Sequence, residues 1–196
     1  MASSAVWGLV LAGGRSRRMG QDKALLRHDG ETQLSHAVRL LEPLLERVFV
    51  SARPDQAADP ERSKFDLIVD RYDNMGPVAG ILSAMERNPA VSWLVVACDL
   101  PNLDRETIRT LLEQRSDERP FTAYKSSYDG LPEPLCAIYA PSARATIDAF
   151  VSDGLVCPRK MLIRSDTALL TQPDPAALDN INTPEDLERS KVGIAS

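Results

Sequence analysis

The sequence predicts an α/β protein, a three-layer sandwich in which helices cover both faces of a mostly parallel central sheet. Short β-branched or apolar runs alternate with segments of helical periodicity along the 196 residues. The run Ser92–Ala97 (SWLVVA) is apolar without alternation, which is typical of a strand covered on both faces. Strands separated by helices pair in parallel through crossover connections. A chain of this length suits a single domain, expected to span residues 1–196.

The expected strands follow one another along the chain as short runs. They are Ala5–Leu11, Arg47–Ser51, Asp66–Val69, Ser92–Ala97, Phe121–Tyr124, Ala137–Tyr139 and Thr167–Leu170. Two polar segments between these runs, Arg53–Lys64 and Arg115–Pro120, are expected to be surface loops.

Apolar stripes at helical spacing lie between the strands. They are formed by Leu34, Val38, Leu41 and Leu45, by Val78, Ile81, Leu82 and Met85, and by Ile108, Leu111 and Leu112. Pro43 is expected to kink or end the first helix. Pro77 suits the first position of the second helix, and Asp104 is a candidate N-cap for the third. Near the end of the chain, residues 183–186 (TPED) have the shape of a capping box.

The composition excludes several classes of partner. The net charge is −5, with 43% hydrophobic and 26% charged residues, which are ordinary globular values. An acidic chain with a pI near 5.1 is poorly suited to non-specific binding of nucleic acid or membrane surfaces. Aromatic residues make up only 5%, which disfavours a base-stacking platform. No apolar run approaches the roughly 18 residues that span a bilayer.

The cysteines and histidines indicate neither a disulfide framework nor a protein-ligated metal cluster. The three cysteines, Cys98, Cys136 and Cys157, are odd in number and form no C-x-x-C pair, which favours a reduced, cytoplasmic setting. His28 and His36 lack a metal-ligand spacing with cysteine or acidic partners and are expected to be structural. No basic residue precedes the N-terminal apolar run, so the order is wrong for a secretory signal.

The most informative stretch is residues 11–23 (LAGGRSRRMGQDK), directly after the first expected strand. Its cations are Arg15, Arg17, Arg18 and Lys23, opposed only by Asp22. Such a concentration in an acidic protein indicates an anionic partner. Gly13 and Gly14 let the backbone approach a ligand closely, and backbone N–H groups with Arg and Lys suit a polyphosphate. The stretch contains neither G-x-x-x-x-G-K-[ST] nor G-x-G-x-x-G, and the alternative is a solvated, arginine-rich loop.

This stretch resembles the signature loop of nucleotidyltransferases with a Rossmann-like fold, L-A-[GA]-G-x-S-x-R-M-G-x-D-K. Among them it is most similar to the molybdenum cofactor guanylyltransferase family. The matching positions are Leu11, Ala12, Gly13, Gly14, Ser16, Arg18, Met19, Gly20, Asp22 and Lys23. The Gly-Gly form, rather than Ala-Gly, favours guanylyl over cytidylyl transfer.

Further landmarks follow in the family's order, so that the resemblance spans most of the chain. Asp70 ends the third expected strand, like an aspartate that such enzymes use near the nucleotide. Residues 76–80 (GPVAG) resemble the G-P-x-A-G segment, and residues 98–101 (CDLP) resemble a C/G-D-x-P metal motif. Residues 133–139 and 180–187 resemble the family's P-L-x-A-x-Y and N-x-N-T-P-E-[DE]-L segments.

The resemblance implies transfer of GMP from GTP to the terminal phosphate of molybdopterin, with release of pyrophosphate. It also implies Mg²⁺ as the cofactor and, as possible partners, proteins that deliver or accept the molybdenum cofactor. Alternatives are a nucleotidyltransferase with another base or acceptor, such as a molybdopterin cytidylyltransferase or a sugar-phosphate nucleotidyltransferase, or a non-catalytic nucleotide-binding protein.

Carried onto this chain residue by residue, the resemblance implies a set of functional groups. The implied catalytic residues are Lys23, Asp99 and Arg18, and Asp99 is also the implied metal ligand. The implied nucleotide-binding residues are Leu11, Ala12, Gly13, Gly14, Arg15, Lys23, Asp70 and Asp99. Asn180 and Asn182 are the implied pterin contacts.

Each of these residues has a plainer interpretation. Asp99 could cap a helix, although Asp104 is better placed for that. Asp70 could be a strand-end turn residue, Lys23 a solvated cation and the two asparagines turn or cap residues. Asp22 is expected to pair with a neighbouring arginine and is assigned no chemistry. The chain has Arg53 where some family members have Asn, so that nucleotide contact is not carried over.

Overall fold

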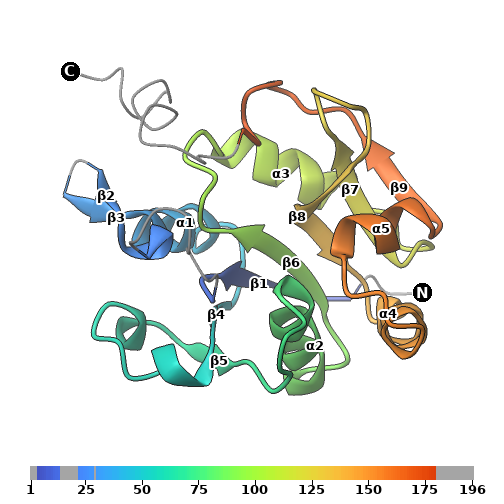
Figure 1. The fold of residues 1–196 in the computed structure, drawn as a ribbon. Helices are drawn as coiled ribbons and strands as arrows, with labels where there is room; N and C mark the ends of the chain where they lie inside the picture. Colours follow the sequence, from blue (N-terminus) through green and yellow to red (C-terminus); the bar gives the residue numbers. More distant parts are fainter. Residues whose placement is uncertain (1–3, 14–21, 29, 180–196) are drawn as a thin grey trace.

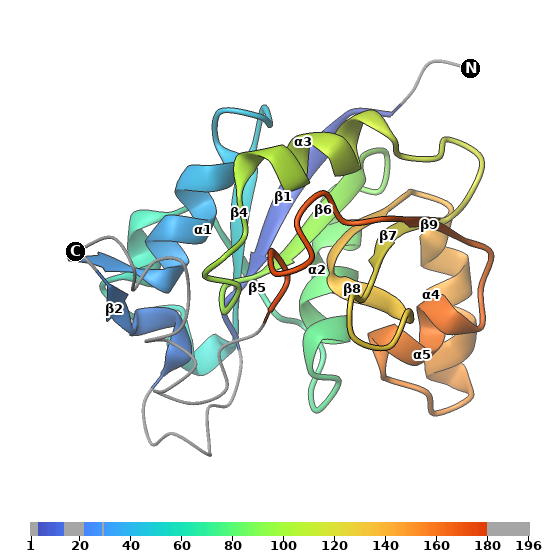
Figure 2. The same ribbon diagram turned by 90° about the horizontal axis from the view of Figure 1, so that it is seen from above.

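The computed structural model describes residues 4–13, 22–28 and 30–179, which form one seven-stranded sheet with helices on both faces. The strands are β1 (Val6–Leu11), β4 (Val48–Ala52), β5 (Leu67–Val69), β6 (Ser92–Ala97), β7 (Phe121–Lys125), β8 (Pro132–Tyr139) and β9 (Thr167–Leu170). Their order across the sheet is β5-β4-β1-β6-β8-β7-β9, which Figure 2 shows from above. Only β8 runs antiparallel to its neighbours, so the prediction of a mostly parallel sheet is confirmed.

The helices divide between the two faces of the sheet (Figure 1). They are α1 (Gln33–Leu41), α2 (Pro77–Arg87), α3 (Arg105–Glu113), α4 (Ala143–Ser152) and α5 (Pro158–Ile163). Helices α1 and α3 share one core cluster with Leu94 and Val96 of β6, whereas α2, α4 and α5 share the other with Trp93 and Val95. Alternate residues of β6 therefore enter opposite cores, which explains its unbroken apolar run and confirms three layers.

Local signals for the helix ends are also confirmed. Helix α1 ends at Leu41, just before Pro43. Pro77 is the first residue of α2, and the Asp104 carboxylate accepts a hydrogen bond from the Thr107 amide at 2.8 Å to cap α3. The expected capping box at 183–186 lies outside the described residues.

Strand β8 begins five residues earlier than the sequence predicts. Pro132 and Pro134 lack an amide hydrogen and cannot donate to a neighbouring strand. In a sequence, prolines therefore argue against a central strand at these positions. In the structure, β6 pairs only with the part from Cys136 to Tyr139, so the prolines lie beyond that ladder. On the other side, β7 meets Pro132 across a register shift. The prolines are therefore tolerated where few ladder bonds are lost.

The remaining elements are short and gather near the start of the chain. They are a hairpin of β2 (Arg27–His28) and β3 (Glu31–Thr32) and the 3₁₀ turns η1 (Lys23–Leu25), η2 (Pro54–Gln56) and η3 (Arg62–Lys64). The prediction that residues 53–64 form a polar surface loop is wrong for Arg62, whose side chain is only 1% exposed. Residues 115–120 do form a loop, and all three cysteines are free.

Gly80 lets α2 pack directly against the sheet beside the end of β4. A Cβ atom here would lie 2.3 Å from the Ser51 hydroxyl oxygen and 2.9 Å from a methyl group of Leu11. Any side chain would force the helix away from the sheet or displace the Ser51 hydroxyl. The second glycine of the GPVAG segment is therefore a packing requirement. Within the described ranges, no helix is both long and apolar enough to cross a membrane.

Candidate functional site

A cavity of about 670 Å³ opens at the carboxyl ends of β1, β4, β5 and β6. The chain passes from β1 to β4 and β5 on one side and then to β6 on the other side of β1. Ligands in open α/β sheets bind where the strand order reverses in this way. Its wall is formed by residues from six segments of the chain, which lie within 11–13, 22–24, 51–55, 70–79 and 97–99 and at Leu135. The fold thus collects residues from distant parts of the chain in one place.

Lys23 and Asp99 meet in this cavity. Asp99 follows β6, and Lys23 is the first residue of η1. The Lys23 ammonium nitrogen lies 3.7 Å from a carboxylate oxygen of Asp99, and the two side chains are 21% and 27% exposed. The helix-cap interpretation of Asp99 is not supported, because Asp104 caps α3. Lys23 is likewise not a freely solvated surface cation, since it is held beside Asp99 in the cavity wall.

The carboxylate of Asp99 suits a magnesium ion that is shared with a substrate. In the described part of the chain, no group of three or more His, Cys, Asp or Glu side chains could hold a metal by itself. Mg²⁺ is commonly held by one or two carboxylates together with substrate phosphates and water. Asp99, a carboxylate on the cavity wall beside a cation, fits that kind of site.

Asp70 lies on the wall formed by the ends of β4 and β5. Its carboxylate accepts a hydrogen bond from the Ser51 hydroxyl at 2.7 Å. A Cβ atom on Gly13 would lie 3.3 Å from the other carboxylate oxygen, so the end of β1 passes close to this acid. Burial raises the pKa of Asp70 above its ordinary value, against the opposing effects of Ser51 and Arg53. Asp70 is thus a partly desolvated acid, which is costly in a simple turn residue.

Replacing Asp70 with Asn is expected to raise the melting temperature of the ligand-free protein at neutral pH. The amide oxygen can still accept the Ser51 hydroxyl, while the cost of a desolvated charge disappears. Since folding raises the pKa of Asp70, ionisation favours the unfolded chain. The gain should be absent below the ordinary pKa, where both states are protonated, and complete above the raised folded pKa. Calorimetry between about pH 3 and 7 measures it, and a less stable variant at neutral pH would contradict the expectation.

Arg53 contacts the protein itself at the cavity wall. Its guanidinium donates to the Gly13 carbonyl and, through two nitrogens, to the Asp55 carboxylate at 2.9 and 2.8 Å. The hydrogen bonds to Asp55 are the main cause of the raised pKa of Arg53. Some family members have Asn at the position of Arg53. This chain therefore has a cation next to the end of β1, where those relatives have an uncharged amide.

A polar network that holds Tyr72, a residue of the cavity wall, escapes sequence reasoning. The Tyr72 hydroxyl donates to the Glu86 carboxylate of α2, which raises the pKa of Tyr72. Glu86 also pairs with Arg71 at 3.3 Å and with Arg144 of α4 at 3.5 Å. No spacing in the sequence links these residues, because they come from three separate elements. The network anchors Tyr72 to α2 and α4.

The other residues implied by the resemblance divide into two sets. Leu11, Ala12 and Gly13 line the cavity, as expected for residues next to a bound nucleotide. Those that lie outside the described residues are Gly14, Arg15, Arg18, Asn180 and Asn182. Asp22 pairs with Arg62, which is distant in the sequence, and the arginines that precede Asp22 in the loop lie outside the described residues.

The chain is similar to known proteins over most of its length. The model of a family described as a MobA-like NTP transferase domain matches residues 8–168. A Molybdenum cofactor biosynthesis bifunctional protein of Synechocystis is 37% identical over 95% of this chain, and the chain spans 54% of that protein's length. A Molybdenum cofactor guanylyltransferase of Shewanella is 30% identical, with 98% of both chains covered.

Solved structures show the same architecture. Molybdopterin-guanine dinucleotide biosynthesis protein A from Archaeoglobus fulgidus superposes with a TM-score of 0.77 at 26% identity, covering 93% of this chain and 95% of that one. A 2-C-methyl-D-erythritol 4-phosphate cytidylyltransferase from Thermus thermophilus shares the fold, with a TM-score of 0.67 at 18% identity. Since the family model covers most of the residues and agrees with the motif read at 11–23, the chain belongs to the family of MobA-like NTP transferase domains.

Proposed function

We propose that this chain transfers GMP from GTP to the terminal phosphate of molybdopterin, forming the guanine dinucleotide cofactor and releasing pyrophosphate. The observation that carries the proposal is the cavity at the switch point of the sheet, with Lys23 and Asp99 3.7 Å apart on its wall. A relative named a molybdenum cofactor guanylyltransferase, aligned over 98% of both chains, supports the choice of base and acceptor.

The reaction needs little acid–base chemistry from the protein. A phosphate monoester has a second pKa of about 6, so that at neutral pH the acceptor is already a nucleophile. An acceptor oxygen attacks the α-phosphorus of GTP, and the bond to the oxygen that bridges to the β-phosphate breaks. Both electrons of that bond leave with pyrophosphate. Catalysis then consists of in-line positioning and neutralisation of charge, and no covalent enzyme intermediate forms.

The residues divide this work between the two ends of the nucleotide. Arg15, Arg18 and Lys23 hold the β- and γ-phosphates, and Leu11–Gly14 with Asp70 accommodate the nucleoside. Asp99 holds Mg²⁺, which when bound offsets negative charge on the phosphates. Asn180 and Asn182 contact the pterin.

Two further parts of the proposal concern the protein's surroundings. The proposed reaction takes place in the cytoplasm, a reducing compartment that suits three free thiols. Since molybdopterin is the acceptor, proteins that deliver it or receive the finished cofactor are the expected partners.

The binding test compares the melting temperature with GTP, CTP, ATP and UTP, each with Mg²⁺. GTP is expected to bind most tightly and therefore to give the largest increase in melting temperature. A ligand at 100 times its Kd stabilises a protein by about 2.7 kcal/mol, which a melting curve detects. A larger increase with CTP would support the cytidylyltransferase alternative. Pyrophosphate release from GTP with molybdopterin then separates a transferase from a non-catalytic nucleotide-binding protein, which would bind without turnover.

A further inference from the structure

Arg62 of η3 is an almost fully buried cation in a segment that is otherwise polar and partly exposed. Its side chain is 1% exposed. Removing a charge from water costs several kcal/mol unless close partners compensate it. The partners of Arg62 therefore indicate why the chain keeps a guanidinium at this place.

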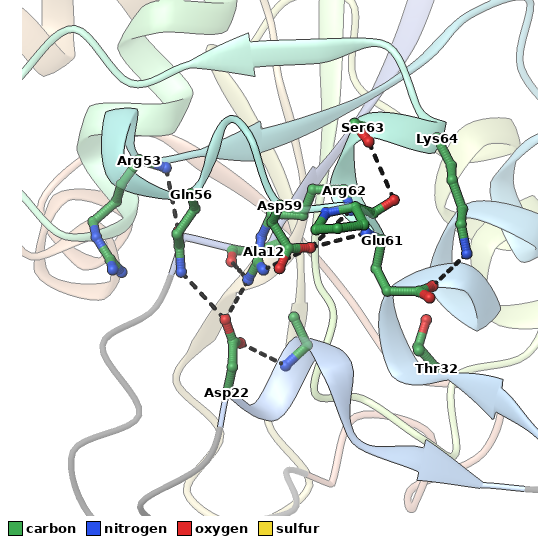
Figure 3. A network of polar contacts seen from close by, with 12 residues as sticks. Ala12, Asp22, Thr32, Arg53, Gln56, Asp59, Glu61, Arg62, Ser63 and Lys64 are labelled. Carbon is green, nitrogen blue, oxygen red and sulfur yellow. Dashed lines mark hydrogen bonds and ion pairs between the residues drawn. The ribbon is translucent and has the colours of Figure 1, made fainter.

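The Arg62 guanidinium joins two points on either side of residues 14–21, which lie outside the described residues (Figure 3). One terminal nitrogen, Nη2, donates to the Ala12 carbonyl at 2.8 Å and to Asp22 Oδ2 at 2.6 Å. Nη1 lies 3.6 Å from the carboxylate of Asp59, which also accepts the Arg62 amide at 3.1 Å. Arg62 thus ties the end of β1 to the start of η1.

Asp22 passes this constraint on to Lys23. Its Oδ1 caps η1 by accepting the Ala24 amide at 3.1 Å, and its Oδ2 accepts Gln56 Nε2 at 3.3 Å besides Arg62. Lys23 is the next residue and the first of η1. Whatever fixes the Asp22 carboxylate therefore fixes the base of the Lys23 side chain, whose ammonium lies beside Asp99.

The pairing of Arg62 leaves one of its donors unsatisfied. Its Nε is buried, and no hydrogen-bond partner for it exists among the described residues. A buried donor without a partner costs roughly 1–3 kcal/mol. The guanidinium is present despite that cost, and it binds Ala12 and Asp22, which line the cavity. This indicates that it is needed to hold these two residues in position.

We propose that Arg62 is a positioning residue, acting through Asp22 to hold Lys23 where it meets the β- and γ-phosphates of the nucleotide. The proposal rests on the proposed function, because it assigns that contact to Lys23. A purely structural ion pair would stabilise the fold but would have no particular connection with the triphosphate. A positioning role predicts that disrupting the Arg62–Asp22 contact weakens binding of GTP more than of GMP, and only while Lys23 is present. A purely structural role predicts neither.

The test is a double-mutant cycle of Asp22→Asn and Lys23→Ala, read out as Kd for GTP and for GMP. In the protein, Asp22 accepts the Ala24 amide with Oδ1 and the Arg62 guanidinium with Oδ2. Asn puts an NH₂ group, which is a donor, in place of one of these oxygens, so one of the two bonds is lost in this geometry. Asp22→Asn is expected to weaken GTP binding about tenfold and GMP binding by less than about twofold. In the Lys23→Ala background the same change should have no further effect on GTP.

Controls keep the outcomes separate. Lys64→Ala removes an exposed ion pair with Glu61 on the same segment and should leave both Kd values unchanged. Where Asp22→Asn does not fold, Arg62→Lys takes its place in the cycle, because it keeps a cation but lacks the planar fork. Equal losses for GTP and GMP, or an effect that persists in full without Lys23, would overturn the positioning role alone. A wild-type protein that binds no nucleoside triphosphate would overturn the proposed function and this inference together.

Discussion

The Asp99→Asn variant is expected to fold normally and to lose roughly a thousandfold in kcat, with GTP affinity changed by less than about tenfold. The amide keeps the shape of the side chain but removes the negative charge that, in the proposed function, would hold Mg²⁺. If the metal offsets charge mainly in the transition state, the loss falls on kcat, and three factors of ten correspond to about 4 kcal/mol.

The measurement is pyrophosphate release from GTP with molybdopterin and Mg²⁺, run beside a melting curve. Asp104→Asn is the matched control, because Asn caps a helix about as well as Asp and this residue lies only five positions away. The control should keep near-normal turnover. A folded Asp99→Asn enzyme with near-normal kcat would exclude Asp99 as the essential metal ligand and make Asp70 the next candidate.

The Lys23→Ala variant is expected to bind GTP ten- to a hundredfold more weakly while binding GMP almost as well as the wild type. A hydrogen bond to a charged group contributes roughly 1.5–3 kcal/mol, and GMP lacks the β- and γ-phosphates that Lys23 would contact. Titration calorimetry with GTP, GDP and GMP measures the difference, with Lys64→Ala as the control for removal of a lysine. Equal losses for GTP and GMP would place the Lys23 contact on the nucleoside end.

Local sequence signals were sufficient for the elements that lie in the centre of the fold. Strand β6 matches the predicted bounds because both of its faces are buried, so every one of its six residues is under the same apolar constraint. Pro77 and Asp104 mark helix starts because each acts on the backbone of its own element. Such signals depend on neighbours within about four residues and not on the rest of the chain.

The elements missed by sequence analysis have weak local patterns. Helix α4 has only Ala143 and Ile147 as buried residues, and α5 is six residues long. Their apolar side chains are selected by packing against the face of the sheet that also carries α2. Periodicity within such short segments cannot be distinguished from a loop with a few apolar residues.

The candidate site divides in the same way. The sequence by itself determined that Asp70 and Asp99 stand at strand ends, and in a parallel sheet those ends share one edge. It also placed Lys23 in the segment that follows the first strand. Only the tertiary structure decided that Arg62 lies against Ala12 and Asp22, fifty and forty residues away. The physical reason is that the place of a motif residue in the fold depends on the local backbone and on the strand that it follows. A buried charge, in contrast, is defined by partners that the chain brings together only when it folds.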